Sequence, residues 1–433
     1  MKQPAAKQAS TGSAGAGALR AYYALAALVA GLLLGMLFAG KAGGGYDVAA
    51  GAAGLIGTLW LNALKMTVVP LVVTLLVVGI GKSAEAASAG RIAGRSVLWI
   101  VVVCTASAIF GVVGMMLLAH IAPLPAATAD ALRAALGGID KSAGTQHVAG
   151  VADFFKDVVP SNVFSAATNG DVLPLVIFSA LFALALTRIG RDRRRAVLEL
   201  FEAIADALLV IIGWVLLLAP LGVLALAYTV GMAAGGAAFA GLGHYVLMIS
   251  LLGILVTLAA YPLGIIAGGI APIAFARALA GPQAVAIATR SSLASLPAML
   301  TAARTLNVRS EVADVALPIS VALFRATGPA MNAAVALYVA YWLGLEPSVG
   351  QLVAATAVAA VMSYGAVSLP GEVSYISSIA PISMALGTPI APLALLVAVE
   401  MIPDIFRTVG NVSMDVALTA AVDRSTARTP PES

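Results

Sequence analysis

Charged residues are scarce in this chain of 433 residues, because Asp, Glu, Lys and Arg together make up only 10% of it. A soluble domain carries about a quarter charged residues, so the composition argues against one. Cys104 is the single cysteine, which excludes an intrachain disulfide. The three histidines are far apart and form no metal-ligand motif. Phosphate-binding loops, Gly-x-Ser-x-Gly elbows and nucleic-acid signatures are also missing. Nothing therefore predicts an enzyme, a cofactor, a metal or a nucleic-acid partner.

Hydrophobic residues dominate what is present, at 61% of the chain with a mean hydropathy of +1.02. Such a chain is a polytopic membrane protein, and its segments are expected to be helical because backbone polar groups must be satisfied within the bilayer. The 43 glycines and 21 prolines indicate closely packed and interrupted helices. Apolar segments cover approximately residues 21–39, 48–78, 96–121, 171–187, 198–230 and 244–269.

The ends and loops of these segments predict the topology. The first apolar segment follows Arg20 and has the features of a signal peptide, but it is long and further helices follow, so we interpret it as a membrane helix. Residues 1–19 form a predicted disordered tail. The compact basic loop over residues 188–195 is interpreted as a solvated loop, and the positive-inside rule makes it and the N-terminus cytoplasmic.

The second half of the chain contains three interrupted apolar segments. Residues 272–306 are broken at a polar tip over 289–297, and residues 349–386 at a tip over 368–372. Each half is too short to span, which predicts two re-entrant hairpins. The segment between them, 312–343, is broken over 324–329. Paired broken segments are the best sequence indicator of a transporter's midplane site.

The last apolar segment, approximately 390–422, carries one polar face. Asp404, Arg407, Asn411 and Asp415 follow at offsets of 3, 7 and 11 residues, which at about 100° per residue fall on one side of a helix. Ionisable groups at membrane depth usually face a protein interior or a water-filled path. A solvated helix end or a structural ion pair is the alternative, but the pattern favours a binding face for a zwitterion.

Several motifs together resemble the dicarboxylate/amino acid:cation symporters, the glutamate-transporter family, in its prokaryotic form. The most specific are Arg290-Ser-Ser-Leu-Ala-Ser-Leu-Pro297 and Asp404-x-x-Arg407-Thr-x-x-Asn411-x-x-x-Asp415. Further matches are Lys65-Met-Thr-Val-Val-Pro70, Asn169-Gly-Asp-Val-Leu-Pro174 and Ala219-Pro-Leu-Gly222. The resemblance extends from residue 20 to residue 424.

The resemblance implies an all-α fold with eight transmembrane segments and two re-entrant helical hairpins. It also implies an elevator-type homotrimer in which each protomer has a scaffold and a moving transport domain. Residues 20–271 would form helices 1–6, mainly scaffold, with helices 3 and 6 joining the transport domain. Residues 272–424 would form the transport core of hairpin 1, broken helix 7, hairpin 2 and helix 8, followed by a tail over 425–433.

The resemblance also implies roles for single residues. Asp404 corresponds to the carboxylate that holds a substrate ammonium, Arg407 to the guanidinium that binds a side-chain carboxylate, and Asn411 to the amide on the α-carboxylate. The remaining implied residues are Ser291 and Ser292 at the tip of hairpin 1, Thr408 in the substrate site, Arg290 as a support for Asp404, and Pro370 and Gly371 in the lid formed by hairpin 2.

This chain departs from the sodium-coupled pattern at the broken helix. Where those members have Asn-Met-Asp-Gly-Thr, this chain has Phe324-Arg-Ala-Thr-Gly328. The aligned third-helix positions are Ile100, Val103 and Cys104 instead of oxygen-bearing residues. Because sodium needs hard oxygen ligands, these changes disfavour it.

We expect Arg325 to compensate for the absence of a sodium ion. Asp415 corresponds to a remaining sodium-ligating carboxylate, which would be left as an unpaired buried charge. We interpret Arg325 as the cation that replaces sodium next to it, and the alternative is that Arg325 faces solvent or a lipid head group. Glu372, in the lid, is either a proton-carrying carboxylate or an exposed acid.

The sequence thus predicts a secondary transporter for aspartate and glutamate in a bacterial inner membrane, sodium-independent, with a proton as the candidate coupling ion. A sodium- or proton-coupled carrier for C4-dicarboxylates is the alternative, although Asp404 would repel a dianion that lacks an ammonium. A neutral amino-acid carrier would leave Arg407 without an anionic partner. An intramembrane hydrolase is disfavoured because this sequence has no histidine near Ser291 and Ser292 that could act as a base. A channel would be distinguished from a transporter by the absence of substrate counterflow.

Overall fold

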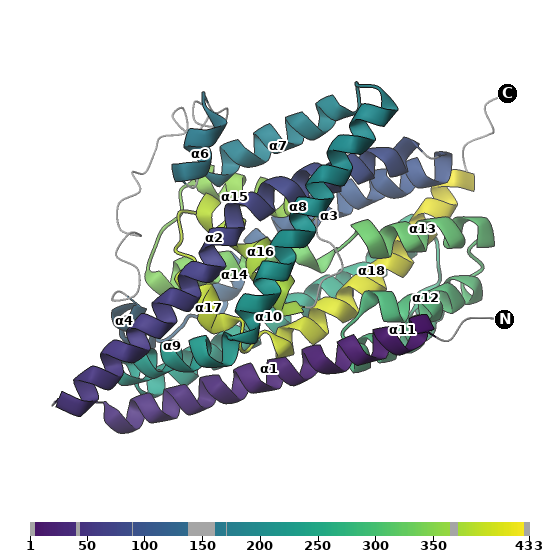
Figure 1. Ribbon diagram of the computed structural model, residues 1–433. Coiled ribbons are helices and arrows are strands. Elements are labelled where there is room, and N and C mark those ends of the chain that lie inside the picture. Colours follow the sequence, from purple (N-terminus) through teal and green to yellow (C-terminus); the bar gives the residue numbers. More distant parts are fainter. Residues whose placement is uncertain are drawn as a thin grey trace.

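A computed structural model describes residues 5–39, 44–88, 90–136, 161–169, 171–363 and 371–427. Within these ranges the protein is helical and contains no strand (Figure 1). Side chains are not described for helical residues 5–21, 44–45, 88, 135–136, 172 and 371–374. The expected class, an α-helical polytopic membrane protein, is therefore confirmed in its coarse form.

The first part of the chain forms long helices with short connections. Their bounds are α1 Ala5–Phe38, α2 Gly44–Ser88, α3 Arg91–Ile121, α4 Ala126–Leu136, α6 Val163–Asn169, α7 Val172–Leu186, α8 Arg191–Leu217, α9 Ala219–Ala234, α10 Gly236–Pro262 and the π-helical turn η2 Leu263–Ala267. The interpretation of 198–230 as a single span is wrong, because the helix ends at Leu217 and restarts at Ala219. Pro220 explains the restart, since proline is favoured in the first turn of a helix and lacks the N–H that a continuous helix needs.

The second part contains the interruptions that the sequence predicts. Helix α11, Pro272–Thr289, is separated from α12, Ser292–Thr305, by two residues, and the two pack against each other as a hairpin. Helices α13, Ser310–Leu323, and α14, Thr327–Leu343, are separated by residues 324–326. Helices α15, Val349–Met362, and α16, Gly371–Ala385, also pack together. The short α17, Ala391–Leu396, precedes α18, Met401–Ala427.

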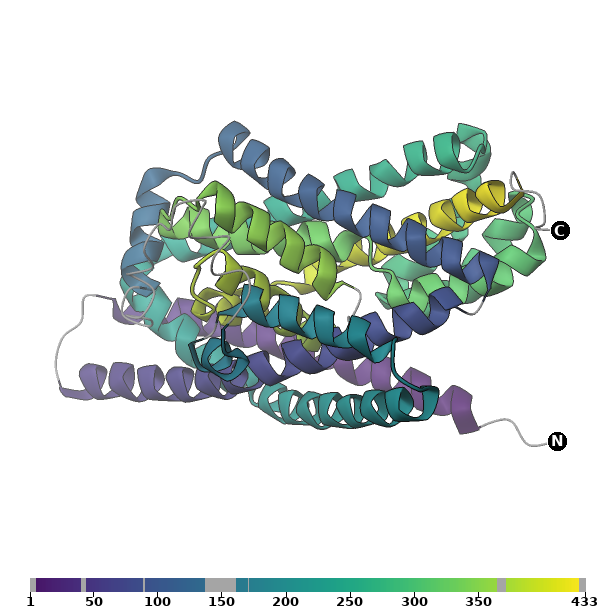
Figure 2. The same cartoon turned by 90° about the horizontal axis from the view of Figure 1, so that it is seen from above.

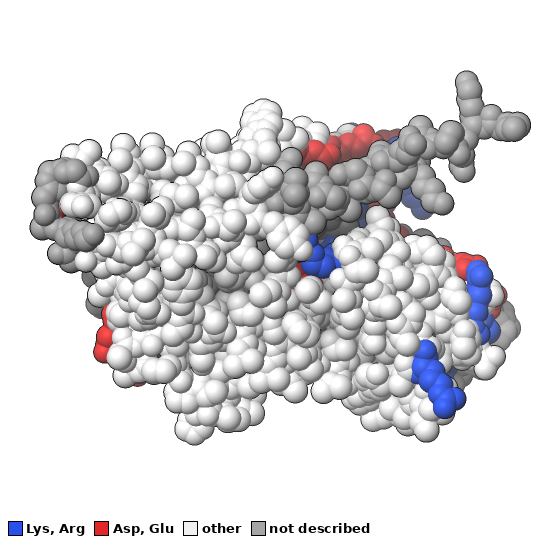
Figure 3. Space-filling view, turned by 90° about the horizontal axis from the view of Figure 1, so that it is seen from below, with Lys and Arg blue, Asp and Glu red and all other residues white. Residues whose placement is uncertain are grey.

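Within the described residues, five helical segments are long and apolar enough to cross a bilayer: 46–87, 91–121, 191–217, 236–267 and the interrupted 310–343. Shorter apolar helices occupy 22–38, 173–186, 219–234, 349–362 and 375–385. The surface agrees with lipid contact, since most of the face in Figure 3 is formed by uncharged residues and Lys, Arg, Asp and Glu form only a few small patches on it.

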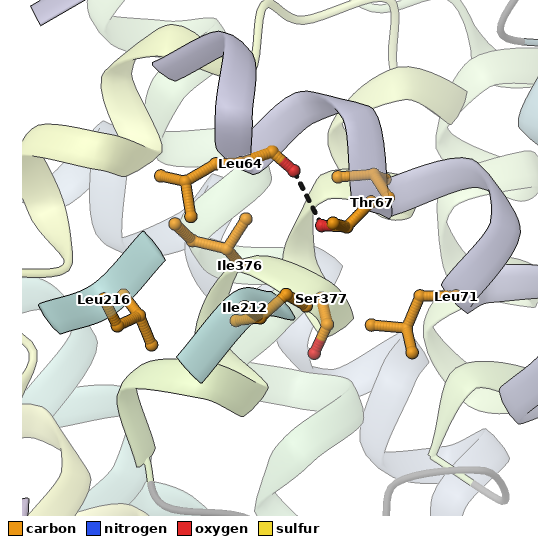
Figure 4. Close-up of a pocket in the computed structure, with 8 residues that line it drawn as sticks. Leu64, Thr67, Leu71, Ile212, Leu216, Ile376 and Ser377 are labelled. Atoms are coloured by element: carbon orange, nitrogen blue, oxygen red, sulfur yellow. Dashed lines mark hydrogen bonds between the residues drawn. The ribbon is translucent and has the colours of Figure 1, made fainter. Parts of the chain in front are cut away.

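Helix α18 lies in the interior and packs against α3, α10, α11, α12, α13 and α14. It passes between the other helices in Figures 1 and 2, whereas α1 lies along the edge of the view in Figure 1. A small apolar cavity of about 10 Å³ lies between α2, α8 and α16, and Leu64, Ile212 and Ile376 are among the residues that line it (Figure 4). That cavity is too small and too apolar to be a substrate site, so the polar interior around α18 is the candidate.

Candidate functional site

The site is built around the first turns of α18. A turn over residues 397–400 precedes this helix, and its first hydrogen bonds include the Asp404 N–H donating to the Glu400 carbonyl at 2.9 Å. Pro403 fits in the first turn because its missing N–H would have no helical partner there. A carboxylate in the first turn, such as that of Asp404, is favoured by the positive end of the helix dipole.

Arg407 is the centre of the polar network. Its Nη2 donates to Glu400 Oε1 at 2.7 Å, and its Nη1 donates to Asn332 Oδ1 at 2.7 Å. Its Nε lies 3.9 Å from Asp404 Oδ1. The side chains of Arg407 and Glu400 are only 14% and 4% exposed, so this ion pair is desolvated. The second oxygen of Glu400 accepts a hydrogen bond from Tyr245 on α10 at 3.0 Å.

The tip between α11 and α12 reaches the same helix through Arg290. Arg290 has φ 50°, a left-handed conformation that ends α11, and its Nη1 lies 3.8 Å from Asp404 Oδ2. Ser291 is the N-cap of α12, where its hydroxyl accepts from the Ala294 N–H at 3.2 Å. The hydroxyl of Ser291 therefore satisfies a helix end in this structure, as such caps commonly do.

Asn411 connects α18 to the start of α14. Its Oδ1 accepts from the Thr327 N–H at 2.9 Å and lies 2.8 Å from the Thr327 hydroxyl, which also lies 2.9 Å from the Arg407 carbonyl. An N–H can only donate, so this contact fixes the oxygen of Asn411 toward Thr327 and leaves its NH₂ for other partners. Thr408 donates its hydroxyl to the Asp404 carbonyl at 2.9 Å and is occupied within its own helix.

The break between α13 and α14 lies beside α3. Phe324 and Ala326 are fully buried, and the Ala326 carbonyl accepts from the Ser107 hydroxyl. Ile100, Val103 and Cys104 are buried on the same helix α3. Asp415 is fully buried, and neither of its carboxylate oxygens has a hydrogen-bond partner. Arg325 influences Asp415 electrostatically, although no hydrogen bond joins the two.

A cavity of about 30 Å³ opens among these groups. It is lined by residues of the broken helix, hairpin 2, the turn before α18 and α18 itself, namely Arg325, Gly328, Asn332, Met362, Ser363, Tyr375, Ser378, Glu400, Arg407 and Asn411. A single water needs about 10–15 Å³ on this measure, so the cavity has room for roughly two waters. Entry of an amino acid would require the lining groups to move apart.

Three of the residues predicted from the sequence, Arg325, Arg407 and Asn411, line the cavity, and Asp404 lies beside Arg407. Ser291, Ser292 and Asp415 are absent from its lining. Pro370 and the side chain of Glu372 lie outside the described residues, and Gly371 is the first residue of α16.

Sequence reasoning missed Glu400, Asn332 and Tyr245. Glu400 carried a usable signal, since it is an acidic residue in an apolar stretch, four residues before Asp404 and thus on the same helical face. Asn332 and Tyr245 reach the site from α14 and α10, and nothing in their local sequence indicates that.

Comparison with known proteins gives the same family as the motifs. The sequence model described as the sodium:dicarboxylate symporter family matches residues 21–425. A proton/sodium-glutamate symport protein of Bacillus subtilis (strain 168) is 28% identical over 377 residues, covering 85% of this chain and 84% of the relative.

Two further relatives differ in their named substrates. A proton/glutamate-aspartate symporter of Escherichia coli (strain K12) is 27% identical over 82% of this chain and 81% of its own length. A C4-dicarboxylate transport protein of Laribacter hongkongensis (strain HLHK9) is 25% identical over 85% of this chain and 82% of its own length. With its interrupted helices and polar α18, the chain is a multi-pass transporter and not an enzyme, and it belongs to the sodium:dicarboxylate symporter family.

Proposed function

We propose that this protein is a secondary active transporter for the acidic amino acids aspartate and glutamate. The observation that carries the proposal is the arrangement of Asp404, Arg407 and Asn411 on successive turns of one buried helix beside a polar cavity. Asp404 would hold the substrate ammonium, and Arg407 would hold the side-chain carboxylate, for which a planar guanidinium is suited. The free NH₂ of Asn411 would donate to the α-carboxylate.

The hairpin tips complete the proposed site. Arg290, 3.8 Å from Asp404, would hold that carboxylate in place, and Ser291, Ser292 and Thr408 would contact the substrate once the tip and the helix reposition around it. Pro370 and Gly371 would belong to the lid. Two names among the relatives support this substrate class, since both mention glutamate.

Sodium independence is the second part of the proposal. Phe324 and Ala326 bring no oxygen-bearing side chain to the broken helix, and Ile100, Val103 and Cys104 bring none from α3. Arg325 would serve as the fixed cation near Asp415, where it already acts electrostatically. A mobile sodium ion would then be unnecessary for balancing that buried carboxylate. A proton remains the candidate coupling ion. The sequence alone offered Glu372, Asp404 and Asp415 as its carriers, and Asp404 could carry it only while no substrate ammonium is bound.

A sodium- or proton-coupled carrier of C4-dicarboxylates is the alternative function. It is favoured by three relatives that are named C4-dicarboxylate transport protein. It is also favoured by the two guanidinium groups near Asp404, at 3.8 Å and 3.9 Å, because they reduce the repulsion of a dianion by this carboxylate.

The proposed architecture follows the family resemblance. Eight membrane segments and two re-entrant hairpins, α11–α12 and α15–α16, would form a scaffold and an elevator-type transport domain in each protomer of a homotrimer. The protomer would lie in a bacterial inner membrane with both termini in the cytoplasm. Native mass spectrometry in mild detergent tests the assembly, and a monomer there would contradict it.

Proteoliposomes that contain the purified protein test the substrate. We expect unlabelled L-aspartate and L-glutamate to drive counterflow of radiolabelled L-aspartate, and succinate to compete poorly because it has no ammonium for Asp404. Equal competition by succinate would favour the dicarboxylate alternative, and absence of counterflow with all three would contradict transport of either class.

A further inference from the structure

Glu400 forms an ion pair with the guanidinium of Arg407, the group that the proposed function assigns to the substrate's side-chain carboxylate. Its Oε1 accepts from Arg407 Nη2 at 2.7 Å, and its Oε2 accepts from the Tyr245 hydroxyl at 3.0 Å. Both oxygens act as acceptors, which is the pattern of an ionised carboxylate. The residue is only 3% exposed, so its charge is balanced by neighbouring groups and not by bulk water.

The groups that face Glu400 come from four helices. Helix α18 contributes the cation of Arg407 and the acid of Asp404, and α14 contributes the neutral amide of Asn332. Helix α10 contributes Tyr245, and α16 contributes Tyr375, whose hydroxyl lies 2.9 Å from that of Tyr245. Because Tyr245 donates its proton to Glu400, Tyr375 donates to Tyr245. The network holds one guanidinium between two carboxylates.

A substrate carboxylate at Arg407 would bring a third acid to the same guanidinium. Like charges at this separation disfavour each other's ionised form, and in shared sites one acid takes up a proton. Asp404 has to stay ionised to hold the substrate ammonium, and Asp415 is not part of the cavity lining. Of the two carboxylates that contact Arg407, Glu400 is therefore the one that can become neutral without loss of a substrate contact.

We propose that Glu400 is the coupling residue, which must accept a proton before Arg407 can bind the substrate's side-chain carboxylate. The proton comes from the aqueous phase on the side where substrate enters and forms an O–H bond at Glu400. The Arg407–Glu400 ion pair is replaced by an Arg407–substrate ion pair, and the neutral Glu400 can donate its hydrogen to the same substrate carboxylate. Release of substrate reverses both changes, so one proton travels with each acidic substrate. This inference rests on the proposed function.

Proton uptake on substrate binding is the direct measurement. The full-length protein in weakly buffered detergent solution is mixed with L-aspartate, and the protons bound are read with a pH-sensitive dye while calorimetry gives the affinity. At neutral pH we expect about one proton per aspartate bound and an affinity that rises as pH falls. In Glu400→Gln we expect proton uptake near zero and an affinity that changes little with pH.

A matched control is Glu199→Gln, which removes a carboxylate that is 59% exposed on α8 and paired with Arg195. It should behave as the unmodified protein does. Where Glu400→Gln fails to fold, Glu400→Asp carries the test, because the shorter acid withdraws from Arg407 and should shift the pH profile of binding. An unchanged profile in that variant overturns the proposal.

The outcomes separate the two claims. Aspartate binding with the same proton uptake in Glu400→Gln overturns the role of Glu400 and leaves the proposed function standing. Absence of binding of any acidic amino acid by the unmodified protein overturns the proposed function itself. Loss of proton uptake with retained aspartate binding in Glu400→Gln supports both.

Discussion

Replacing Arg407 by Gln should impair both the stability of the protein and its binding of aspartate, for different reasons. The variant leaves Glu400 buried at 3% exposure without the cation that balances its charge. It also removes the donor to Asn332 and the group proposed to bind the substrate carboxylate. The two effects have to be separated before a loss of binding can be assigned to a lost substrate contact.

The magnitudes follow from the geometry. Breaking a buried ion pair by removing one partner costs about 3–5 kcal/mol, because the other charge is left uncompensated. With an unfolding entropy of roughly 2 cal/mol/K per residue, a chain of 433 residues would melt about 3–6 °C lower. Loss of a charge-assisted contact with substrate costs about 1.5–3 kcal/mol, which corresponds to at least a tenfold weaker affinity.

The double variant Glu400→Gln/Arg407→Gln resolves the ambiguity. Two neutral amides replace the buried pair, so most of the lost thermal stability should return, while aspartate affinity should stay at least tenfold weaker. Differential scanning fluorimetry and calorimetry measure the two quantities on the same preparations. Unchanged melting of the single variant would refute the structural role of the ion pair, and unchanged aspartate affinity would refute Arg407 as the substrate ligand.

Three further predictions concern other positions. Replacing Arg325 by Met should weaken aspartate binding by about tenfold or more, since Asp415 loses the guanidinium that acts on it electrostatically, and should partly restore a response to sodium; calorimetry with and without sodium measures both, and unchanged affinity would contradict the role. Replacing Asp404 by Asn should weaken binding of aspartate more than that of succinate, and an equal loss in competition assays would argue against an ammonium contact. Replacing Gly111 by Ala should destabilise the protein by about 1–3 kcal/mol, because the new methyl would overlap the backbone of Ala330, whereas Gly51→Ala meets nothing within 4 Å and should not lower the melting temperature.

The sequence predicted the interruptions because they have a local cause. Polar tips and prolines within apolar runs marked the breaks at 290–291 and 324–326, and helices α12 and α14 restart within a few residues of those positions. The break at Leu218 was missed because hydropathy averages across it, and only Pro220 marks it. Eight membrane spans and the elevator arrangement stay predictions, since five described segments meet the length and hydropathy of a span.

The site was predictable where helical periodicity alone places the side chains. Asp404, Arg407 and Asn411 share a face of α18 because their spacing requires it. The partner of Arg407 was not assigned from the sequence. The spacing of Glu400 from Asp404 indicated a shared face, but the second hydrogen bond of Glu400 comes from Tyr245, 155 residues away. Contacts of that kind depend on how α10 and α14 pack against α18, which no local pattern encodes.

The central claim, an acidic amino-acid transporter that does not use sodium, is tested most directly by the affinity for L-aspartate with sodium or choline as the only added cation. Coupling to an ion requires that the ion bind the carrier states differently. By the family resemblance, Phe324 and Ala326 stand at positions where sodium-coupled members carry oxygen ligands. Calorimetry on the unmodified protein over a pH series should give equal affinities in the two salts and tighter binding at low pH. A steep increase in aspartate affinity with sodium concentration would contradict the account.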